Sequence, residues 1–108
     1  ALTMTISADT LDALKQKHGE VWTLERAGKD YVLRCPEAAE YRRFLVTVAD
    51  DRKALFDAQE RLARHAVVLP DAAALSALLE RRPGLVPWLA GEAANIAADL
   101  EETEAKKA

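Results

Sequence analysis

The sequence predicts an α+β domain in which an N-terminal helix and a β-hairpin pack against a mostly helical bundle of four or five helices. Alanine supplies 22 and leucine 15 of the 108 residues, and both are strong helix formers. Two segments in the first third alternate apolar and polar residues on either side of a glycine turn, which is typical of a hairpin. Apolar residues at helical spacing, interrupted by prolines and glycines, indicate helices over the rest of the chain.

A chain of 108 residues has the usual length of one domain. We expect that domain over residues 8–100, with a loose leader over 1–7 and a polar, frayed C-terminal tail over 101–108. The 50% apolar content and the net charge of −3 argue against disorder and against a dedicated nucleic-acid-binding protein, which usually carries a basic stripe. Membrane spans and a signal peptide are not predicted. One cysteine excludes an internal disulfide and fits a reducing compartment, so we expect a cytoplasmic protein.

The first helix is expected to begin after Ser7 or Asp9, whose side-chain oxygens can accept amide protons of the first turn. Its apolar residues include Leu11 and Leu14. Gly19 is expected to end the helix, because glycine readily adopts the left-handed conformation found after helix C-termini.

The hairpin is expected to pair residues 21–25 with residues 31–35. With Gly28 and Lys29 as the two-residue loop, Leu24 lies opposite Leu33, and Trp22 lies opposite Cys35. These four side chains then share one face of the ribbon, which must be covered by helices because a two-stranded ribbon is marginal in water.

A second helical region is expected to follow Pro36, because a proline is well suited to the first turn of a helix. Its apolar stripe contains Tyr41, Phe44, Leu45 and Val48, and apolar positions at helical spacing continue to Leu69. Residues 46–51 form a potential break. The pattern is therefore compatible with one helix of roughly thirty residues or with two helices separated by a kink.

Two more helices are predicted after Pro70. Asp71 is expected to cap the first of them, and Pro83 with Gly84 to end it. The last helix is expected from about Val86, with Pro87 in its first turn.

We find no residue pattern that predicts catalysis or cofactor binding. Cys35 with His18 or His65 matches no nucleophile motif, and Cys35 is expected to be buried beside Trp22, where its thiol would be unreactive. The sequence contains no repeated metal-ligand spacing and no glycine-rich phosphate loop. We therefore predict a non-enzymatic protein without a catalytic, cofactor or metal site. Basic residues alternate with acids, which makes nucleic acid an unfavoured partner.

With catalysis, metal binding and nucleic-acid binding disfavoured, the predicted function is binding to another protein. Trp88 follows Pro87 at a helix start, where side chains are often partly open, and a second candidate surface is the corner between hairpin and helix. The candidate partner-binding residues are Tyr41, Phe44, Leu85, Trp88 and Leu89. Replacing Trp88 by alanine is expected to weaken partner binding without unfolding the domain.

Several segments resemble, in their order, the tail assembly chaperones of long-tailed bacteriophages and related prophages. The resemblance covers roughly residues 10 to 100. It departs from the family at Cys35, where an arginine or another polar residue is common before the proline. The segments that carry it are Lys15-Gln16-Lys17-His18-Gly19, Val21-Trp22-Thr23-Leu24, Tyr31-Val32-Leu33-Arg34, Cys35-Pro36-Glu37-Ala38-Ala39-Glu40-Tyr41-Arg42-Arg43-Phe44, Val67-Val68-Leu69-Pro70-Asp71 and Leu78-Leu79-Glu80-Arg81-Arg82-Pro83-Gly84-Leu85.

The resemblance implies a phage assembly factor that acts in the cytoplasm of the bacterial host. Such chaperones coat the long, helical tape measure protein, help to recruit tail tube protein, and are absent from the finished tail. Many copies would line one helix, so self-association is expected as well. The alternatives are a small structural component of a phage tail or tail-like particle and, third, a nucleic-acid-binding regulator.

Overall fold

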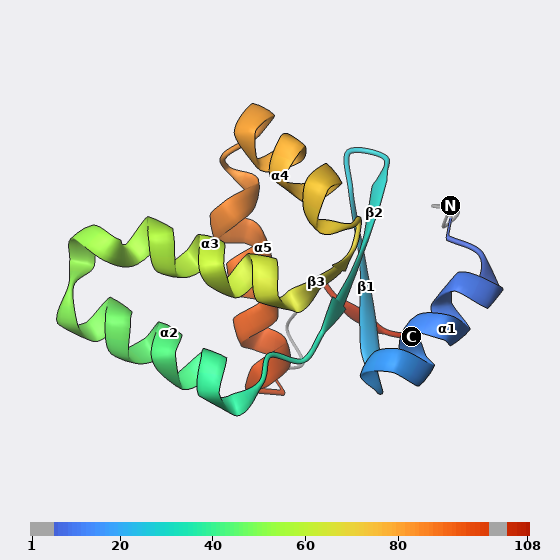
Figure 1. The fold of residues 1–108 in the computed structure, drawn as a ribbon, viewed down its shortest axis with the longest axis horizontal. Helices are drawn as coiled ribbons and strands as arrows, with labels where there is room; N and C mark the ends of the chain where they lie inside the picture. Colours follow the sequence, from blue (N-terminus) through green and yellow to red (C-terminus); the bar gives the residue numbers. More distant parts are fainter. Residues whose placement is uncertain (1–5, 100–103) are drawn as a thin grey trace.

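The α+β prediction is confirmed by the computed structural model, which describes residues 6–99 and 104–108. Five α-helices, a short 3₁₀ helix and four strands are present in this part of the chain (Figure 1). In chain order they are α1 (Ala8–His18), β1 (Val21–Arg26), β2 (Lys29–Arg34), α2 (Ala38–Asp50), η1 (Arg52–Ala54), α3 (Leu55–Ala66), β3 (Val67–Leu69), α4 (Ala72–Arg81), α5 (Leu85–Ala97) and β4 (Lys106–Lys107).

The four strands form one antiparallel sheet in the order β3-β2-β1-β4. One face of the sheet contributes Leu24, Tyr31 and Leu33 to the main hydrophobic core, which also contains residues of α3, α4 and α5. The other face buries Val21 and Val32, and α1 lies on that side of the sheet (Figure 1). The sheet is therefore a middle layer between α1 and the other helices.

The first helix is confirmed at both ends. Ser7 is its cap, because its hydroxyl oxygen accepts a hydrogen bond from the backbone N–H of Thr10 at 3.1 Å. Gly19 follows the last residue with a φ of +79°, and its N–H donates to the carbonyl of Lys15 at 2.7 Å. This conformation explains why glycine stands at this position.

The hairpin is confirmed, but the predicted register is wrong by two residues. Trp22 lies opposite Leu33, and Leu24 lies opposite Tyr31. The loop is Ala27 and Gly28, both with positive φ, and a tight two-residue turn of this kind favours glycine in its second position rather than its first. Because side chains alternate between faces, a shift of two residues changes the pairs but keeps every side chain on its predicted face.

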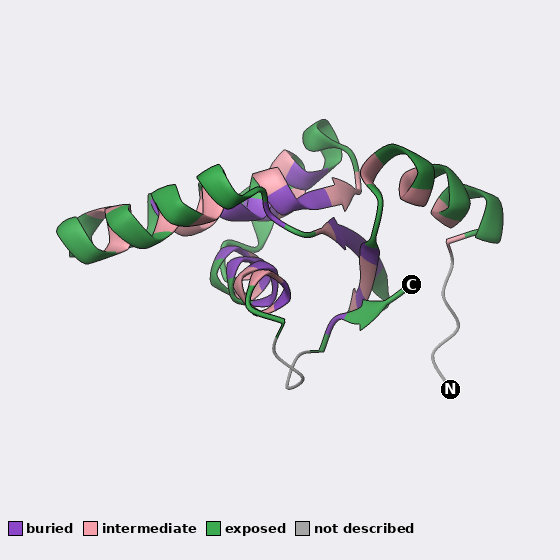
Figure 2. Cartoon of the chain, turned by 90° about the horizontal axis from the view of Figure 1, so that it is seen from below, coloured by how far each residue is buried: buried purple, intermediate pink, exposed green. Residues whose placement is uncertain are grey.

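Helix α5 is the most deeply buried helix, as Figure 2 shows by the purple residues along it. Val86, Leu89, Ala90 and Ala93 are each no more than 1% exposed. The small alanine side chains let α3 and α5 approach closely, since Ala63 and Ala66 of α3 are also fully buried. The alanine-rich composition thus serves close helix packing.

The long helical region after Pro36 consists of two helices. Asp51 leaves the helical conformation at φ −145° and ψ 100°, and its carboxylate accepts a hydrogen bond from the N–H of Lys53 at 3.0 Å. The short turn η1 then reverses the chain, so that α2 and α3 lie side by side as a helical hairpin (Figure 1). The break predicted near residues 46–51 is thus a reversal of direction rather than a kink.

The prediction of a frayed tail is wrong for residues 104–108, while residues 100–103 lie outside the described part. Ala105 is 5% exposed, and Lys106–Lys107 pair with β1. The buried Glu92 of α5 fixes this segment, because its carboxylate accepts a hydrogen bond from the N–H of Ala105 at 3.0 Å. The lysine side chains of this strand remain exposed, which is why its sequence shows no apolar alternation.

Candidate functional site

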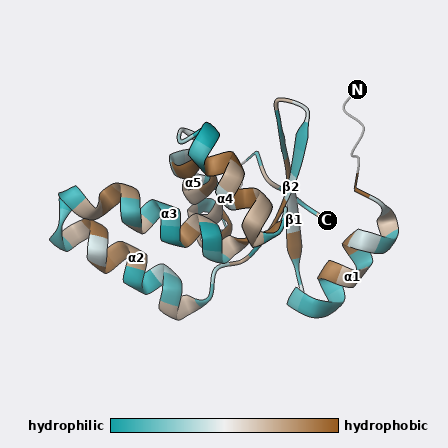
Figure 3. Ribbon diagram, turned by 45° about the horizontal axis from the view of Figure 1, so that its top comes forward, coloured by the Kyte–Doolittle hydropathy of each residue, from teal (hydrophilic) through white to brown (hydrophobic). Residues whose placement is uncertain are grey.

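Four large apolar side chains are exposed on the outer part of the α2–α3 hairpin, away from its contacts with the sheet. These residues, called the hairpin tip below, are Leu45, Val46, Leu55 and Phe56, with exposed fractions of 48%, 52%, 40% and 45%. Leu55 and Phe56 begin α3 just after the turn between the two helices, while Leu45 and Val46 lie near the middle of α2. Apolar residues are present along both helices (Figure 3). Exposed apolar side chains that cluster on a projecting element often mark a protein-binding surface.

Two sets of polar contacts hold the base of this hairpin. The guanidinium of Arg61 on α3 donates to both carboxylate oxygens of Glu40 on α2, at 3.1 and 3.3 Å. Arg34, at the end of β2, donates from Nε to the carbonyl of His65 at 2.9 Å and lies 3.6 Å from the carboxylate of Glu37. The sheet is thereby tied to the first turn of α2 and to the last turn of α3. The hairpin tip therefore projects from a fixed base.

His65 is held between two hydrogen-bond donors. Its Nδ1 lies 3.0 Å from Nη2 of Arg34, and its Nε2 accepts from the backbone N–H of Glu37 at 3.0 Å. A protonated imidazole would present N–H groups to both donors, which is unfavourable. Burial lowers the pKa of His65 below its ordinary value, and the charge of Arg34 lowers it further, although the carboxylates of Glu40 and Glu37 act in the opposite direction.

The fold is therefore expected to lose stability as the pH falls below about 6.5, where an unfolded histidine takes up a proton that the folded state resists. Burial also lowers the pKa of His18, which contributes in the same direction. Urea unfolding between neutral and mildly acidic pH measures the effect. The pH dependence should become weaker in His65→Gln than in the unmodified protein. An unchanged dependence in that variant would exclude His65 as its source.

The corner residues predicted as partner-binding, Tyr41 and Phe44, lie on α2, and Phe44 directly precedes Leu45. Both are half-buried, and Phe44 packs against the main core. The exposed large apolar side chains of α2 are instead Leu45 and Val46.

The second predicted patch is not an open surface. Leu89 is completely buried in the core, so its prediction as a partner-binding residue is wrong. Leu85 and Trp88 are half-buried and pack against the core. The indole of Trp88 meets the ring of Tyr31 edge to face at 5.6 Å and 76°, and the guanidinium of Arg26 lies 4.6 Å from its centre.

One sequence feature besides the apolar periodicity indicates exposed apolar side chains at the hairpin tip. Leu45 and Val46 are adjacent, and adjacent residues in a helix point about 100° apart. Both therefore cannot lie at the centre of a stripe that contains Tyr41, Phe44 and Val48. At least one large apolar side chain had to be directed away from α3 or from the core.

Cys35 differs from its prediction. It follows the last residue of β2 and is exposed, beyond the last residue pair of β1 and β2. Partial burial of its thiol and the carboxylate of Glu20 raise its pKa, which disfavours the reactive thiolate. Within residues 6–99 and 104–108, histidine, cysteine and carboxylate side chains form no group of three that could hold a metal ion.

In the same described part, none of the helices is long and apolar enough to cross a membrane. Comparison with curated proteins finds no match, and comparison with solved structures finds none. A family model does match, over residues 14–106, from within α1 to the first residue of β4. The matched region thus includes the sheet, the helical hairpin and the buried α5. The chain belongs to the DUF6848 family, which is defined by a domain of unknown function.

Proposed function

We propose that this protein is a non-enzymatic tail assembly chaperone of a long-tailed phage or prophage. In this proposal it binds the tape measure protein in the bacterial cytoplasm and helps to recruit tail tube subunits. The order of sequence segments supports this assignment, because the hairpin, the proline at the strand exit and the Pro-Gly-Leu turn resemble those of tail assembly chaperones. Phage tail assembly requires protein–protein binding surfaces and no chemical step from such a factor.

The hairpin tip is the observation that carries the proposal. A long helical partner presents an apolar face that must be shielded from water until assembly, and it is recognised through apolar side chains of the binding protein. Leu45, Val46, Leu55 and Phe56 offer such side chains on a projecting element with a fixed base. Several copies along one partner helix would place their tips on successive stretches of it. Self-association is part of the same proposal.

The proposal is tested by following the protein through tail assembly. We expect it to co-purify with the tape measure protein from cells in which assembly is under way. Mass spectrometry of purified particles should then detect the tape measure and tail tube proteins but not this chain. If the chain is present in particles in amounts comparable to the tail proteins, it is a structural component and the chaperone proposal is wrong.

A further inference from the structure

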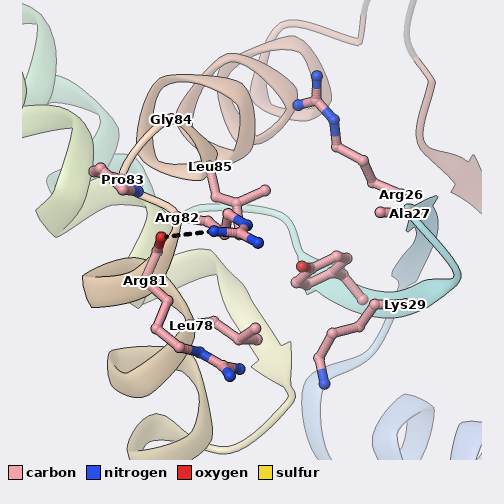
Figure 4. Close-up of a pocket in the computed structure, with 10 residues that line it drawn as sticks. Arg26, Ala27, Lys29, Leu78, Arg81, Arg82, Pro83, Gly84 and Leu85 are labelled. Carbon is pink, nitrogen blue, oxygen red and sulfur yellow. Dashed lines mark hydrogen bonds between the residues drawn. The ribbon is translucent and has the colours of Figure 1, made fainter.

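A basic pocket lies where the β1–β2 turn approaches the junction of α4 and α5. Its volume is about 650 Å³. Figure 4 shows Arg26 at one end of the pocket, Arg82 in the middle, and Arg81 and Lys29 at the other end. The four cationic side chains thus come from two parts of the chain that are more than fifty positions apart in sequence.

The positive charges around this pocket have no acidic partner among the residues that the structure describes. No acidic side chain is among the residues that line it, and none of its four cations takes part in a salt bridge within the described part of the chain. Among the described residues, the guanidinium of Arg82 donates to the carbonyl of Arg81 at 3.3 Å, and that of Arg26 lies over the ring of Trp88 at 4.6 Å. The whole chain nevertheless carries a net charge of −3. An anionic ligand would relieve the mutual repulsion of these side chains.

The pocket is also partly apolar, which narrows the class of ligand. Leu78 and Leu85 are half-buried side chains in its wall, beside the buried ring of Tyr31. A nucleic-acid strand needs an extended basic path for successive phosphates. The net charge of −3 also disfavours a nucleic-acid ligand. A short peptide that combines carboxylates with an apolar side chain matches both the cations and the leucines.

We propose that this pocket binds an acidic peptide segment of a partner protein, with at least two carboxylates flanking an apolar residue. In bound form, the carboxylates lie between Arg81, Arg82 and the cations of the β1–β2 turn, and the apolar residue contacts Leu78 and Leu85. This pocket shares no residue with the hairpin tip, so one copy of the chain can hold two partner segments at once. The proposal does not depend on the identity of the partner at the tip.

The test uses the full chain and a short fluorescent peptide that alternates glutamate with leucine. Fluorescence anisotropy at low salt should detect binding, and Arg81→Glu with Arg82→Glu should weaken it by about tenfold or more. The matched control is Arg42→Glu with Arg43→Glu, an exposed arginine pair on α2 that changes the charge equally. Lys29→Glu provides a second pocket variant should the double variant fail to fold, which circular dichroism checks.

Three competing probes complete the test. A peptide with glutamine in place of glutamate should bind at least about tenfold more weakly, because it lacks the charges. Inorganic phosphate and a single-stranded oligonucleotide should compete poorly. The proposal is overturned if the acidic peptide does not bind, if both arginine-pair variants weaken binding equally, or if the oligonucleotide binds through the pocket more tightly than the peptide.

Discussion

Replacing Trp88 by alanine is expected to lower the free energy of unfolding by about 3 kcal/mol, the lower end of the cost of truncating a core aromatic side chain. The indole contacts the ring of Tyr31 and the guanidinium of Arg26, and its Nε1–H donates to the carboxylate of Glu104 at 3.1 Å. The indole therefore joins α5 to the β1–β2 hairpin and to the C-terminal segment. We expect the lower end of the range because the side chain is half-buried rather than enclosed.

Urea unfolding followed by circular dichroism measures this loss. Trp88→Phe is the matched variant, because it keeps a six-membered aromatic ring beside Tyr31 while it removes the five-membered ring of the indole with its N–H. We expect it to lose about 1–2 kcal/mol, from the lost hydrogen bond and the lost ring volume together. If Trp88→Ala is as stable as the unmodified protein, the side chain does not hold these elements together. Its role as an open partner-binding residue would then regain support.

Replacing Leu45 and Phe56 together by glutamine is expected to weaken binding of the tape measure protein by about a hundredfold or more. Central apolar residues of an interface often contribute about 2 kcal/mol each to the binding free energy. The loss of two such residues corresponds to a decrease in affinity of more than about a hundredfold. Glutamine retains helix propensity, and both side chains are more than two-fifths exposed, so the fold should be nearly unaffected.

Binding is measured by titrating the purified chain against a soluble helical fragment of the tape measure protein. The control replaces Arg42 and Lys53, two exposed polar residues of the same hairpin, by glutamine. The affinity of the control variant should be within a few fold of that of the unmodified protein, because exposed charges contribute little. Its affinity should depend on salt differently, because the variant has lost two positive charges. Equal loss in both variants, or a fall in the melting temperature of the tip variant, would contradict a specific binding role for the tip.

The sequence predicted correctly those helix ends that are formed by a capping side chain or by a glycine. Ser7, Gly19 and Asp71 act through contacts within a few residues, and the structure places each in its predicted role. The β1–β2 turn was harder because Gly28 fits two neighbouring loop registers. The preference of such turns for glycine in the second position favours the observed register, and the pairing of the whole strands is consistent with it.

The remaining differences arise from contacts between distant segments. Strand β4 is only two lysines long. It forms because the N–H of Ala105 donates to the carboxylate of Glu92 and because the two lysines pair with β1. Similarly, nothing adjacent to Trp88 in sequence indicates that Tyr31 and Arg26 pack against it. Leu89 was assigned to a surface for the same reason, because the elements that bury it lie elsewhere in the chain.

The central claim is that this chain shields an apolar helical partner through its hairpin tip. Co-expression of the tape measure protein with and without this chain, followed by centrifugation and quantification of both proteins, tests it most directly. We predict that the tape measure protein is soluble only with the unmodified chain and is insoluble with Leu45→Gln plus Phe56→Gln. A tape measure protein that remains insoluble with the unmodified chain, or equally soluble with the tip variant, would contradict the claim.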